Sequence, residues 1–205
     1  IKLIIGSRVI KRRIKKVFDN SIIEFLNHFS NNLIRHKKTK DYPDLIALAF
    51  WCTSKNFKKH QLLIKKHMPR VGKGILFHIA PSNVPTNFFY SLVFGILTGN
   101  TNIVKIPSNN FPQIAIICDV LKKLLKSQRY KKIKELIFLV SYSSEHSKPT
   151  DFFSEICDLR IIWGGDLTIN KVRSSYIRPD CIDIVFSDKY SVSIINSKKI
   201  LSLGP

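Results

Sequence analysis

The chain has 205 residues, of which 44% are hydrophobic and 23% are charged, so it is long enough and apolar enough for a globular domain with its own core. Lysine and arginine outnumber aspartate and glutamate by 34 to 14, which gives a formal net charge of +20. This charge fits a polyanionic partner, but the basic residues are spread along the sequence rather than gathered in one stripe, which disfavours a nucleic-acid-binding protein. No apolar run reaches the roughly 18 residues that cross a membrane, so we expect no transmembrane segment.

Cysteine and histidine spacing gives no sign of a metal site. The cysteines at positions 52, 118, 157 and 181 include no CxxC pair, and His60 and His67 have no cysteine or carboxylate at ligand spacing. The first residues lack a secretory signal pattern, so we expect a cytoplasmic protein with reduced thiols and no bound metal. Because the chain does not begin with methionine, we also expect a fragment or a processed product.

Residues 1–70 are expected to form an N-terminal helical segment. Residues 1–16 alternate apolar and basic side chains without a strict period, which fits an amphipathic membrane-surface segment or, more often, a helix or strand lying on the domain. Apolar residues at helical spacing predict a helix over 22–34, with Asn20 or Ser21 as its cap, and a second helix over 45–52. Residues 55–70 are polar and basic, which is typical of surface.

The centre of the sequence predicts a strand, helix and strand in succession. The apolar run 75–80 suits a buried strand, and the sequence Pro-Ser-Asn-Val-Pro at 81–85 stops it, because the two prolines lack amide donors. A helix over 88–97 and a strand over 101–106 complete a βαβ unit, in which the two strands are parallel. Ligands bind at the carboxyl ends of such strands, where residues 81–83 and 105–108 are expected to meet.

The alternation of strands and helices continues to the end of the chain. We expect helices over 111–127, 150–157 and 167–174, with Cys118 buried on the first, and strands over 136–140, 159–162, 182–186 and 191–195. The turn at 163–166, Trp-Gly-Gly-Asp, joins a strand to a helix. This pattern predicts an α/β fold with an open, largely parallel sheet over residues 71–205.

Three segments carry a resemblance to a known family. Residues 77–85 (Phe-His-Ile-Ala-Pro-Ser-Asn-Val-Pro), residues 163–166 and residues 47–52 resemble the LuxC family, the fatty acyl-CoA reductases of bacterial luminescence, within the aldehyde dehydrogenase superfamily. The similarity runs from about residue 44 to about residue 195. It implies a Rossmann-like sheet of the aldehyde dehydrogenase type, with residues 71–205 as a dinucleotide-binding domain. It also implies the cofactor-binding part of a reductase that converts a fatty acyl-CoA, or an acyl-protein thioester, to an aldehyde with NADPH.

The resemblance assigns two catalytic roles. Asn83 matches an asparagine whose amide holds the thioester or aldehyde oxygen, although an asparagine in a turn can instead bond to its own backbone. Asp188, counted from Gly165, matches the glutamate that acts as general base, and the alternative is a surface turn at 187–189. The nucleophilic cysteine of the superfamily lies downstream in a second domain, and Cys181 has no counterpart in the family. We therefore expect this chain alone to be inactive.

The resemblance also implies a dinucleotide site. The lysine at the end of the second strand meets the adenosine ribose, but aligning the prolines puts Ile106 rather than Lys105 in its place, and a bulge would be needed to restore the direction. No carboxylate follows at 108–110, which favours NADPH and permits NAD. The glycines at 164–165 let a backbone approach a pyrophosphate, and Asp166 is either a ligand or the helix N-cap. The expected cofactor-binding residues are Ala80, Pro81, Ser82, Lys105, Ser108, Gly164, Gly165 and Asp166.

The resemblance also implies binding partners, and two alternative functions remain open. Expected partners are the acyl thioester, the missing catalytic domain and a second copy of the chain in a homo-oligomer. One alternative is an NAD(P)-dependent aldehyde dehydrogenase fragment that works in the oxidative direction. The other is a non-catalytic, basic, nucleic-acid-binding protein on the same fold, since a fold does not fix a function.

Overall fold

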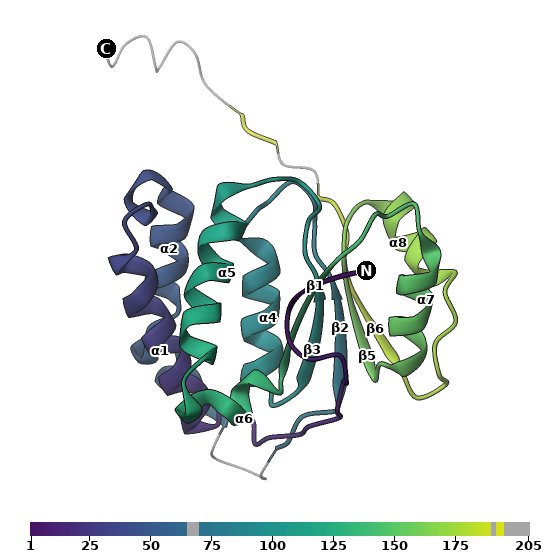
Figure 1. The fold of residues 1–205 in the computed structure, drawn as a ribbon. Helices are drawn as coiled ribbons and strands as arrows, with labels where there is room; N and C mark the ends of the chain where they lie inside the picture. Colours follow the sequence, from purple (N-terminus) through teal and green to yellow (C-terminus); the bar gives the residue numbers. More distant parts are fainter. Residues whose placement is uncertain (65–69, 190–191, 195–205) are drawn as a thin grey trace.

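The computed structural model describes residues 1–64, 70–189 and 192–194. These residues form a six-stranded sheet between two layers of helices (Figure 1). The strand order is β1-β4-β3-β2-β5-β6, and every neighbouring pair is parallel except β1 with β4. The expected α/β fold with a largely parallel sheet is therefore confirmed. The strands are β1 (Lys2–Ile5), β2 (Ile75–Ile79), β3 (Thr101–Lys105), β4 (Ile137–Ser141), β5 (Leu159–Trp163) and β6 (Ile182–Phe186).

Helices cover both faces of the sheet. On one face lie α4 and α5, and α1, which contacts both of them, brings α2 and α3 into an outer layer (Figure 1). On the opposite face lie α7 and α8. The helices are α1 (Asn20–Arg35), α2 (Pro43–Trp51), α3 (Ser54–Ile64), α4 (Asn87–Leu97), α5 (Pro112–Leu125), α6 (Lys131–Lys134), α7 (Ser147–Ile156) and α8 (Asp166–Arg173). Two short 3-10 helices, Thr39–Asp41 and Gln128–Tyr130, complete the elements.

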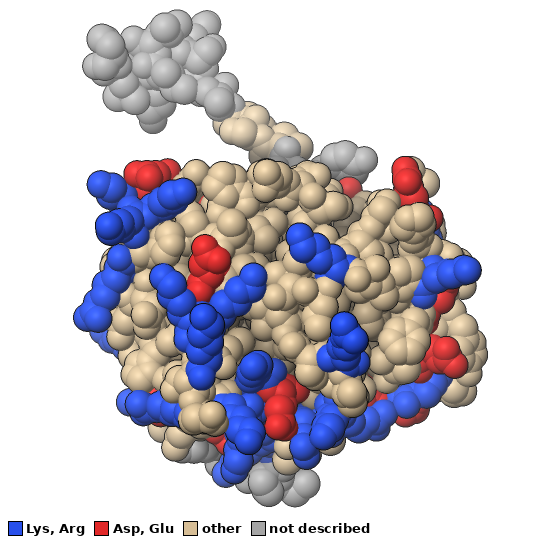
Figure 2. All heavy atoms as spheres, in the orientation of Figure 1, with Lys and Arg blue, Asp and Glu red and all other residues tan. Residues whose placement is uncertain are grey.

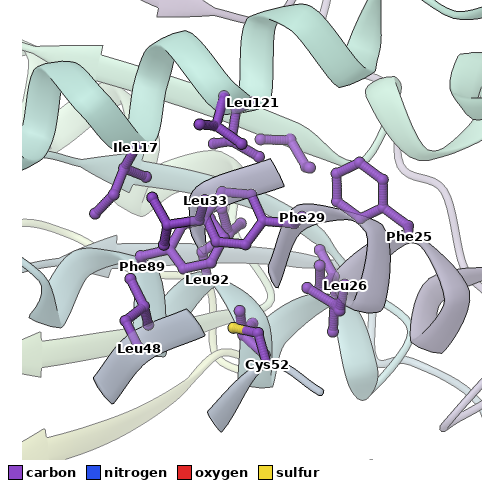
Figure 3. Close-up of a cluster of buried hydrophobic side chains, with 14 of the residues drawn as sticks. Phe25, Leu26, Phe29, Leu33, Leu48, Cys52, Phe89, Leu92, Ile117 and Leu121 are labelled. Carbon is purple, nitrogen blue, oxygen red and sulfur yellow. The ribbon is translucent and has the colours of Figure 1, made fainter. Parts of the chain in front are cut away.

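The two-residue period of the strands divides the apolar side chains between two cores. On β2, Ile75, Phe77 and Ile79 face α7 and α8, and the side chains of β3 and β4 follow the same alternation. The larger core lies under α4 and α5 and includes α1 and α2 (Figure 3). There Phe29 of α1 stacks on Phe89 of α4 with ring centroids 4.2 Å apart. This stacking fixes the outer helices on the sheet through α4.

One element of the N-terminal segment is a strand, which was one of the two alternatives expected for residues 1–16 but departs from a wholly helical segment. Lys2–Ile5 is not helical but forms β1, the antiparallel edge strand beside β4. The chain then runs across the start of β3, where Arg13 N donates to Thr101 Oγ1 at 2.9 Å and Lys15 N donates to Gly99 O at 2.8 Å. An alternating basic and apolar stretch fits an edge strand as well as a helix, so sequence pattern alone could not separate them. The domain boundary at residue 70 stays a prediction.

Other elements differ in their limits. The N-cap of α1 is Asp19, whose carboxylate accepts from Ser21 N at 2.8 Å, rather than Asn20 or Ser21. Helix α7 begins at Ser147 instead of at 150, and α3 was not expected at all, because only Phe57 and Gln61 of it are buried. The predicted strand 191–195 lies partly outside the described residues, and the described part, 192–194, has no regular structure.

Charge on the surface follows the composition. Figure 2 shows lysine and arginine side chains along the lower edge of the visible face, near α6, and scattered elsewhere, with acidic side chains among them. Tan, uncharged surface separates the basic groups over the middle of this face. None of the helices within the described residues combines the length and the apolar character that a membrane span requires.

Candidate functional site

A cleft of about 820 Å³ lies at the carboxyl ends of the parallel strands. Strand β2 has β3 on one side and β5 on the other. The chain adds β3 and β4 on one side of β2 and then returns to add β5 and β6 on the other side, so the order of the strands reverses between β2 and β5. Open α/β sheets bind ligands at such a switch point, because the loops after the two strands diverge and leave a crevice. The cleft is lined by the segments that follow β2, β3, β5 and β6.

The cleft brings together nine of the ten residues that the sequence singled out. Asp166 is the exception, because it is the first residue of α8 and does not line the cleft. Its expected role as N-cap is also wrong, since Gly165 occupies that position. The nine residues are Ala80, Pro81, Ser82, Asn83, Lys105, Ser108, Gly164, Gly165 and Asp188. Their roles stay predictions, but their common location follows from the topology.

Asn83 lies in the exposed turn after β2. Pro81 and Pro85 flank it and restrict the backbone, and the turn is tied to the loop after β3 because Asn109 Nδ2 donates to Ser82 O at 3.1 Å. Within the described part of the chain, the Asn83 side chain makes no hydrogen bond to its own turn. Its amide therefore remains free to donate into the cleft.

The glycine turn after β5 opens a helix toward the cleft. Gly164 has φ +155°, in the region that favours glycine, and Gly165 is the N-cap of α8 without a side-chain capping bond. The first amides of α8 are therefore open to an anion. A Cβ on Gly165 would lie 2.6 Å from Asp188 Oδ2, so this carboxylate lies directly against the turn.

Asp188 enters the cleft from the segment after β6. Its side chain is exposed, so the surface-turn alternative is not removed by burial. It nevertheless shares the cleft with Asn83, which comes from the end of β2. The two side chains expected to act in catalysis are thus presented by the loops on either side of the switch point.

Lys105 ends β3 and points toward the α7–α8 face. The strand pairs in regular register, with Lys105 opposite Ile79 and Val140, so the bulge that would bring Lys105 into the place aligned with Ile106 is absent. Lys105 nevertheless lines the cleft. Its ammonium lies 4.9 Å from the centroid of the Tyr142 ring. Burial lowers the pKa of Lys105, and the nearby charge of Lys171 adds to this effect. Ile106 is buried and also lines the cleft.

An apolar groove of about 690 Å³ adjoins the cleft and was not foreseen from the sequence. It lies between α4 and one face of β5 and β6, and on this face no helix covers the two strands among the described residues. Ile161, Ile184 and Phe94 line it, and the last is 58% exposed. Trp163 and Phe186 line both the groove and the cleft. The sequence signal that could have indicated this groove was the alternation of apolar residues along β6.

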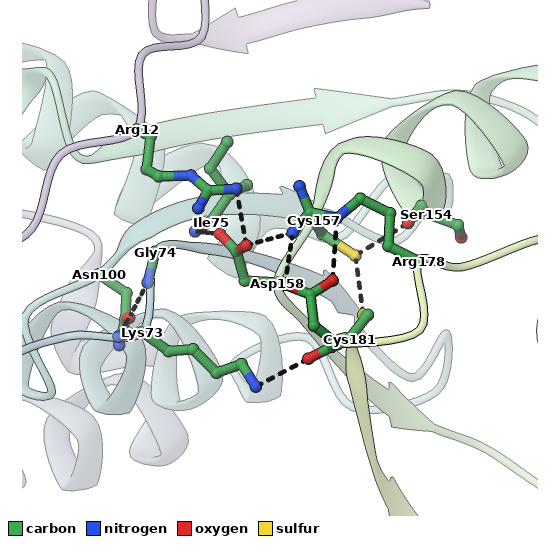
Figure 4. A network of polar contacts seen from close by, with 11 residues as sticks. Arg12, Lys73, Gly74, Ile75, Asn100, Ser154, Cys157, Asp158, Arg178 and Cys181 are labelled. Atoms are coloured by element: carbon green, nitrogen blue, oxygen red, sulfur yellow. Dashed lines mark hydrogen bonds and ion pairs between the residues drawn. The ribbon is translucent and has the colours of Figure 1, made fainter.

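The four cysteines are all buried, and none lines the cleft. Burial raises the pKa of the Cys118 thiol to about 11, and it raises the pKa values of Cys52 and Cys157 still further. Cys157 and Cys181 lie together, with their Sγ atoms 3.7 Å apart (Figure 4). A thiolate is the nucleophilic form of cysteine, so these buried thiols are poor candidates for acyl transfer.

A polar network around Asp158 holds the amino ends of the central strands, at the end of the sheet opposite to the cleft (Figure 4). The buried carboxylate accepts from Ile75 N at 2.7 Å and pairs with Arg12 at 2.7 Å and with Arg178. Asp158 thus joins the start of β2 to the start of β5, the two strands whose far ends frame the cleft. No group of three or more His, Cys, Asp or Glu residues that could hold a metal occurs in the described ranges.

Comparison with known proteins places the chain in a family. The family described as "Acyl-CoA reductase (LuxC)" matches residues 25–202. No curated protein matches the chain. The expected resemblance to this family is therefore confirmed over most of the sequence.

Solved structures with the same fold are aldehyde dehydrogenases. Lactaldehyde dehydrogenase from Escherichia coli superposes with a TM-score of 0.56 at 17% identity, covering 82% of this chain and 39% of its own. The glyceraldehyde-3-phosphate dehydrogenase GapN from Methanocaldococcus jannaschii, complexed with NADP, gives 0.58 at 14% identity, covering 83% and 41%. An NAD-dependent benzaldehyde dehydrogenase from Corynebacterium glutamicum gives 0.55 at 13% identity, covering 84% and 42%. The chain thus spans less than half of each of these structures, and the likeness confirms the expected fold.

Proposed function

Because the chain belongs to the acyl-CoA reductase (LuxC) family, we propose that it is the cofactor-binding part of an enzyme that reduces a fatty acyl thioester to an aldehyde with NADPH. The observation that carries the proposal is the cleft at the switch point. Nine residues expected at a dinucleotide and reaction site, from four separate segments, line this one space of about 820 Å³.

The residues of the cleft fit a dinucleotide. The Gly164–Gly165 turn lets a pyrophosphate approach the backbone, and the uncapped N-terminus of α8 supplies amide donors and a favourable dipole. Lys105 adds a positive charge at the neighbouring strand end. No carboxylate stands at 108–110 to repel a 2′-phosphate, which favours NADPH over NADH. The bound cofactor would supply the hydride for the reduction.

The side chains of this chain then act on the acyl carbonyl. Asn83 donates an amide hydrogen to the carbonyl oxygen, and this bond strengthens as negative charge develops there in the transition state. The prolines around Asn83 hold the donor in place before the reaction, so little reorganisation is needed. Asp188, at the edge of the same cleft, accepts a proton from water or a thiol as general base.

The apolar groove provides a place for a long acyl chain. It meets the cleft at Trp163 and Phe186, so a carbonyl beside Asn83 can extend its hydrocarbon tail between α4 and the β5–β6 face. Burying apolar surface there contributes roughly 25 cal/mol per Å². The proposed substrate is therefore a fatty rather than a short acyl thioester.

The nucleophilic cysteine of the proposed reaction is not among the four in this chain. All four are buried away from the cleft, which leaves the acyl-accepting thiol to another domain of the reductase. The proposed partner is thus the cysteine-bearing part of the enzyme, which would meet this chain where the cleft and the groove open.

The test is a fluorescence titration with NADPH and NADH. Trp51 and Trp163 are the two tryptophans, and a Trp51→Phe variant leaves Trp163, at the edge of the cleft, as the single reporter. We expect saturable quenching, with tighter binding of NADPH. A Gly164→Ala variant should bind both nucleotides more weakly, because alanine is strained at φ +155° and closes the turn.

Other outcomes separate the alternatives. Tighter binding of NADH would contradict the NADPH assignment and favour an oxidative aldehyde dehydrogenase. No binding of either nucleotide by the folded chain would overturn the proposal and favour a non-catalytic protein. Binding to nucleic acid that weakens steeply with salt would then identify the nucleic-acid alternative.

A further inference from the structure

Two buried cysteines, Cys157 and Cys181, meet at the amino ends of β5 and β6, far from the cleft (Figure 4). Their Sγ atoms are 3.7 Å apart, and the proposed function uses neither thiol. They belong to no group of three or more possible metal ligands among the described residues, so metal binding does not account for the pairing. Two thiols this close together have a chemistry of their own, which is oxidation to a disulfide.

The backbone holds the two cysteines at a separation that a disulfide can span. Leu159 of β5 lies opposite Ile182 of β6 in a parallel pair. The pairing extends one residue further, because Ile182 N donates to Asp158 O at 3.4 Å. Cys157 and Cys181 are therefore one residue out of register on neighbouring chain segments. A strand spacing of about 4.8 Å and a rise of about 3.3 Å per residue put their Cα atoms roughly 5.8 Å apart, within the range of roughly 4.4–6.8 Å that disulfides require.

The two thiols differ in their surroundings. Cys157 is fully buried, and its thiol donates to Ser154 O at 3.3 Å. Cys181 is 9% exposed, so a small oxidant reaches it first. The sulfur atoms must approach from 3.7 Å to about 2.05 Å, and rotation of the less enclosed Cys181 side chain can supply this movement.

We propose that Cys157 and Cys181 are a redox-sensitive pair, which hydrogen peroxide joins in a disulfide. The Cys181 sulfur attacks one peroxide oxygen, so that an S–O bond forms, the O–O bond breaks, and the hydroxide that leaves takes the thiol proton as water. The Cys157 sulfur then attacks the sulfur of this sulfenic acid, the S–O bond breaks, and the second hydroxide leaves with the Cys157 proton as water. The two thiols lose two electrons and two protons, and the peroxide is reduced to two molecules of water.

The disulfide closes a loop that holds one wall of the cleft. Residues 157–181 contain β5, the Gly164–Gly165 turn and α8, and the turn lines the cleft. A cross-link restricts the unfolded chain more than the folded one, so local opening of this unit becomes rarer in the oxidised protein. The pair thus makes the stability of the β5–α8–β6 unit dependent on oxidation, whether or not the cleft binds a dinucleotide.

The test counts free thiols in the full chain before and after treatment with hydrogen peroxide. Maleimide labelling of the unfolded protein, measured by intact mass, should find all four thiols before treatment, only two after it, and four again after dithiothreitol. Peptide mapping should place the link between Cys157 and Cys181. Four thiols remaining after treatment, or a link that joins other cysteines or two copies of the chain, would overturn the proposal.

Serine variants separate the roles of the two thiols. In Cys157→Ser the sulfenic acid of Cys181 has no second thiol beside it, so it should persist and react with dimedone. In Cys181→Ser the fully buried Cys157 should give no such adduct in the same time. Cys118→Ser is the matched control, because it removes another buried thiol, 5% exposed, and should leave the disulfide unchanged. An adduct on Cys157 rather than on Cys181 would contradict the order of the two steps.

Hydrogen–deuterium exchange measures the effect of the bond on the fold. Amides of β5 and β6 should exchange at least about tenfold more slowly in the oxidised than in the reduced chain, and those of α1, which packs on the other side of the molecule, should slow by a smaller factor. Cys118→Ser should show the same slowing and Cys157→Ser none. Equal exchange in the oxidised and reduced chains would show that the bond leaves the β5–α8–β6 unit as it was, and the proposed switch would fail.

Discussion

Trp163 and Phe186 stack face to face at the ends of β5 and β6, with ring centroids 4.0 Å apart and planes within 9° of parallel. The two rings form the wall that the cleft and the apolar groove share. One side of this wall is expected to meet the nicotinamide and the acyl carbonyl, and the other the hydrocarbon tail. The stack therefore lies between the two parts of the proposed substrate site, the cleft and the apolar groove.

The groove predicts a dependence on acyl chain length. Phe94 on α4 lines the groove and is 58% exposed, and its ring packs edge-on against Trp51, so Phe94→Ser should lower the free energy of unfolding by only about 1 kcal/mol. Binding of dodecanoyl-CoA should weaken about 10- to 150-fold, because one aromatic contact worth roughly 1.5–3 kcal/mol is lost, whereas acetyl-CoA should be unaffected. Calorimetric titration measures both. Phe152→Ser, on α7 and 52% exposed, is the control, and an equal effect from it would contradict the groove assignment.

The cysteines predict that this chain forms no acyl-enzyme. All four thiols are buried, and burial raises the pKa values of Cys52, Cys118 and Cys157, which keeps these groups protonated at neutral pH. Intact-mass spectrometry after incubation with a long-chain acyl-CoA should show the unmodified mass. A hydroxylamine-sensitive adduct that disappears in one cysteine-to-serine variant would show that the chain carries its own nucleophile after all.

The sequence predicted the turns that line the cleft better than it predicted their surroundings, for a physical reason. The turns around Asn83 and Gly164 depend on local chemistry, namely flanking prolines and a glycine at positive φ, and turns of this kind can be recognised from a few residues. The apolar groove depends on what covers β6. The alternation of Ile182 and Ile184 showed a strand, but only the three-dimensional structure shows that this face has no helix over it among the described residues.

Long-range partners were also beyond the sequence pattern. Arg160 is the second residue of the short strand β5, and nothing in its neighbours indicates that it pairs with Asp183 of the next strand. Helix α3 was missed, and strand β1 could not be told from a helix, because their polar or alternating sequences fit more than one structure. In each case the deciding interactions come from residues far away in the chain.

The burial of His78 leads us to expect that the protein loses stability in mild acid. The imidazole is fully buried between Ser91 Oγ at 2.8 Å and Asn102 Oδ1 at 3.0 Å, and burial lowers its pKa to about 4. Between pH 6.5 and about 4 the unfolded chain binds the proton and the folded chain does not, so the free energy of unfolding should fall as pH falls, by up to about 1.4 kcal/mol per pH unit.

Urea unfolding at pH 7 and at pH 5 measures this dependence. His78→Gln keeps a polar side chain but removes the titration, so its difference between the two pH values should be clearly smaller than that of the parent. Equal differences in the two proteins would mean that the acid sensitivity comes from other groups.

The close packing around Gly95 predicts that Gly95→Ala destabilises the protein, although helix propensity alone would favour alanine. Alanine in a helix interior is favoured over glycine by about 1 kcal/mol, yet a Cβ on Gly95 would lie 1.8 Å from Asn102 Oδ1 and 3.1 Å from His78 Cε1. Asn102 cannot easily move, because its Nδ2 donates to Asn100 O at 2.7 Å. Gly95→Ala should therefore destabilise by roughly 1–3 kcal/mol, as overpacking does.

A double variant tests whether this contact is the cause. Asn102→Ala removes the oxygen that the new methyl group would meet, so Gly95→Ala should cost much less in that background than in the parent, as measured by urea unfolding. Simple additivity of the two costs would place the strain elsewhere in α4.

Among these substitutions, we expect the largest loss of stability when the buried ion pair of Arg160 and Asp183 is broken. Arg160 is 1% exposed and donates to both oxygens of Asp183, at 2.7 and 2.8 Å, and to Ser154 Oγ at 3.1 Å. Asp183→Ala would leave this buried guanidinium without its counter-charge, which typically costs about 3–5 kcal/mol. Arg173 lies 3.6 Å from the same carboxylate but is 52% exposed, so Arg173→Ala should cost less than about 1 kcal/mol. Chemical denaturation of the two variants checks both values, and a small cost for Asp183→Ala would mean that the surrounding carbonyl groups alone can hold the charge.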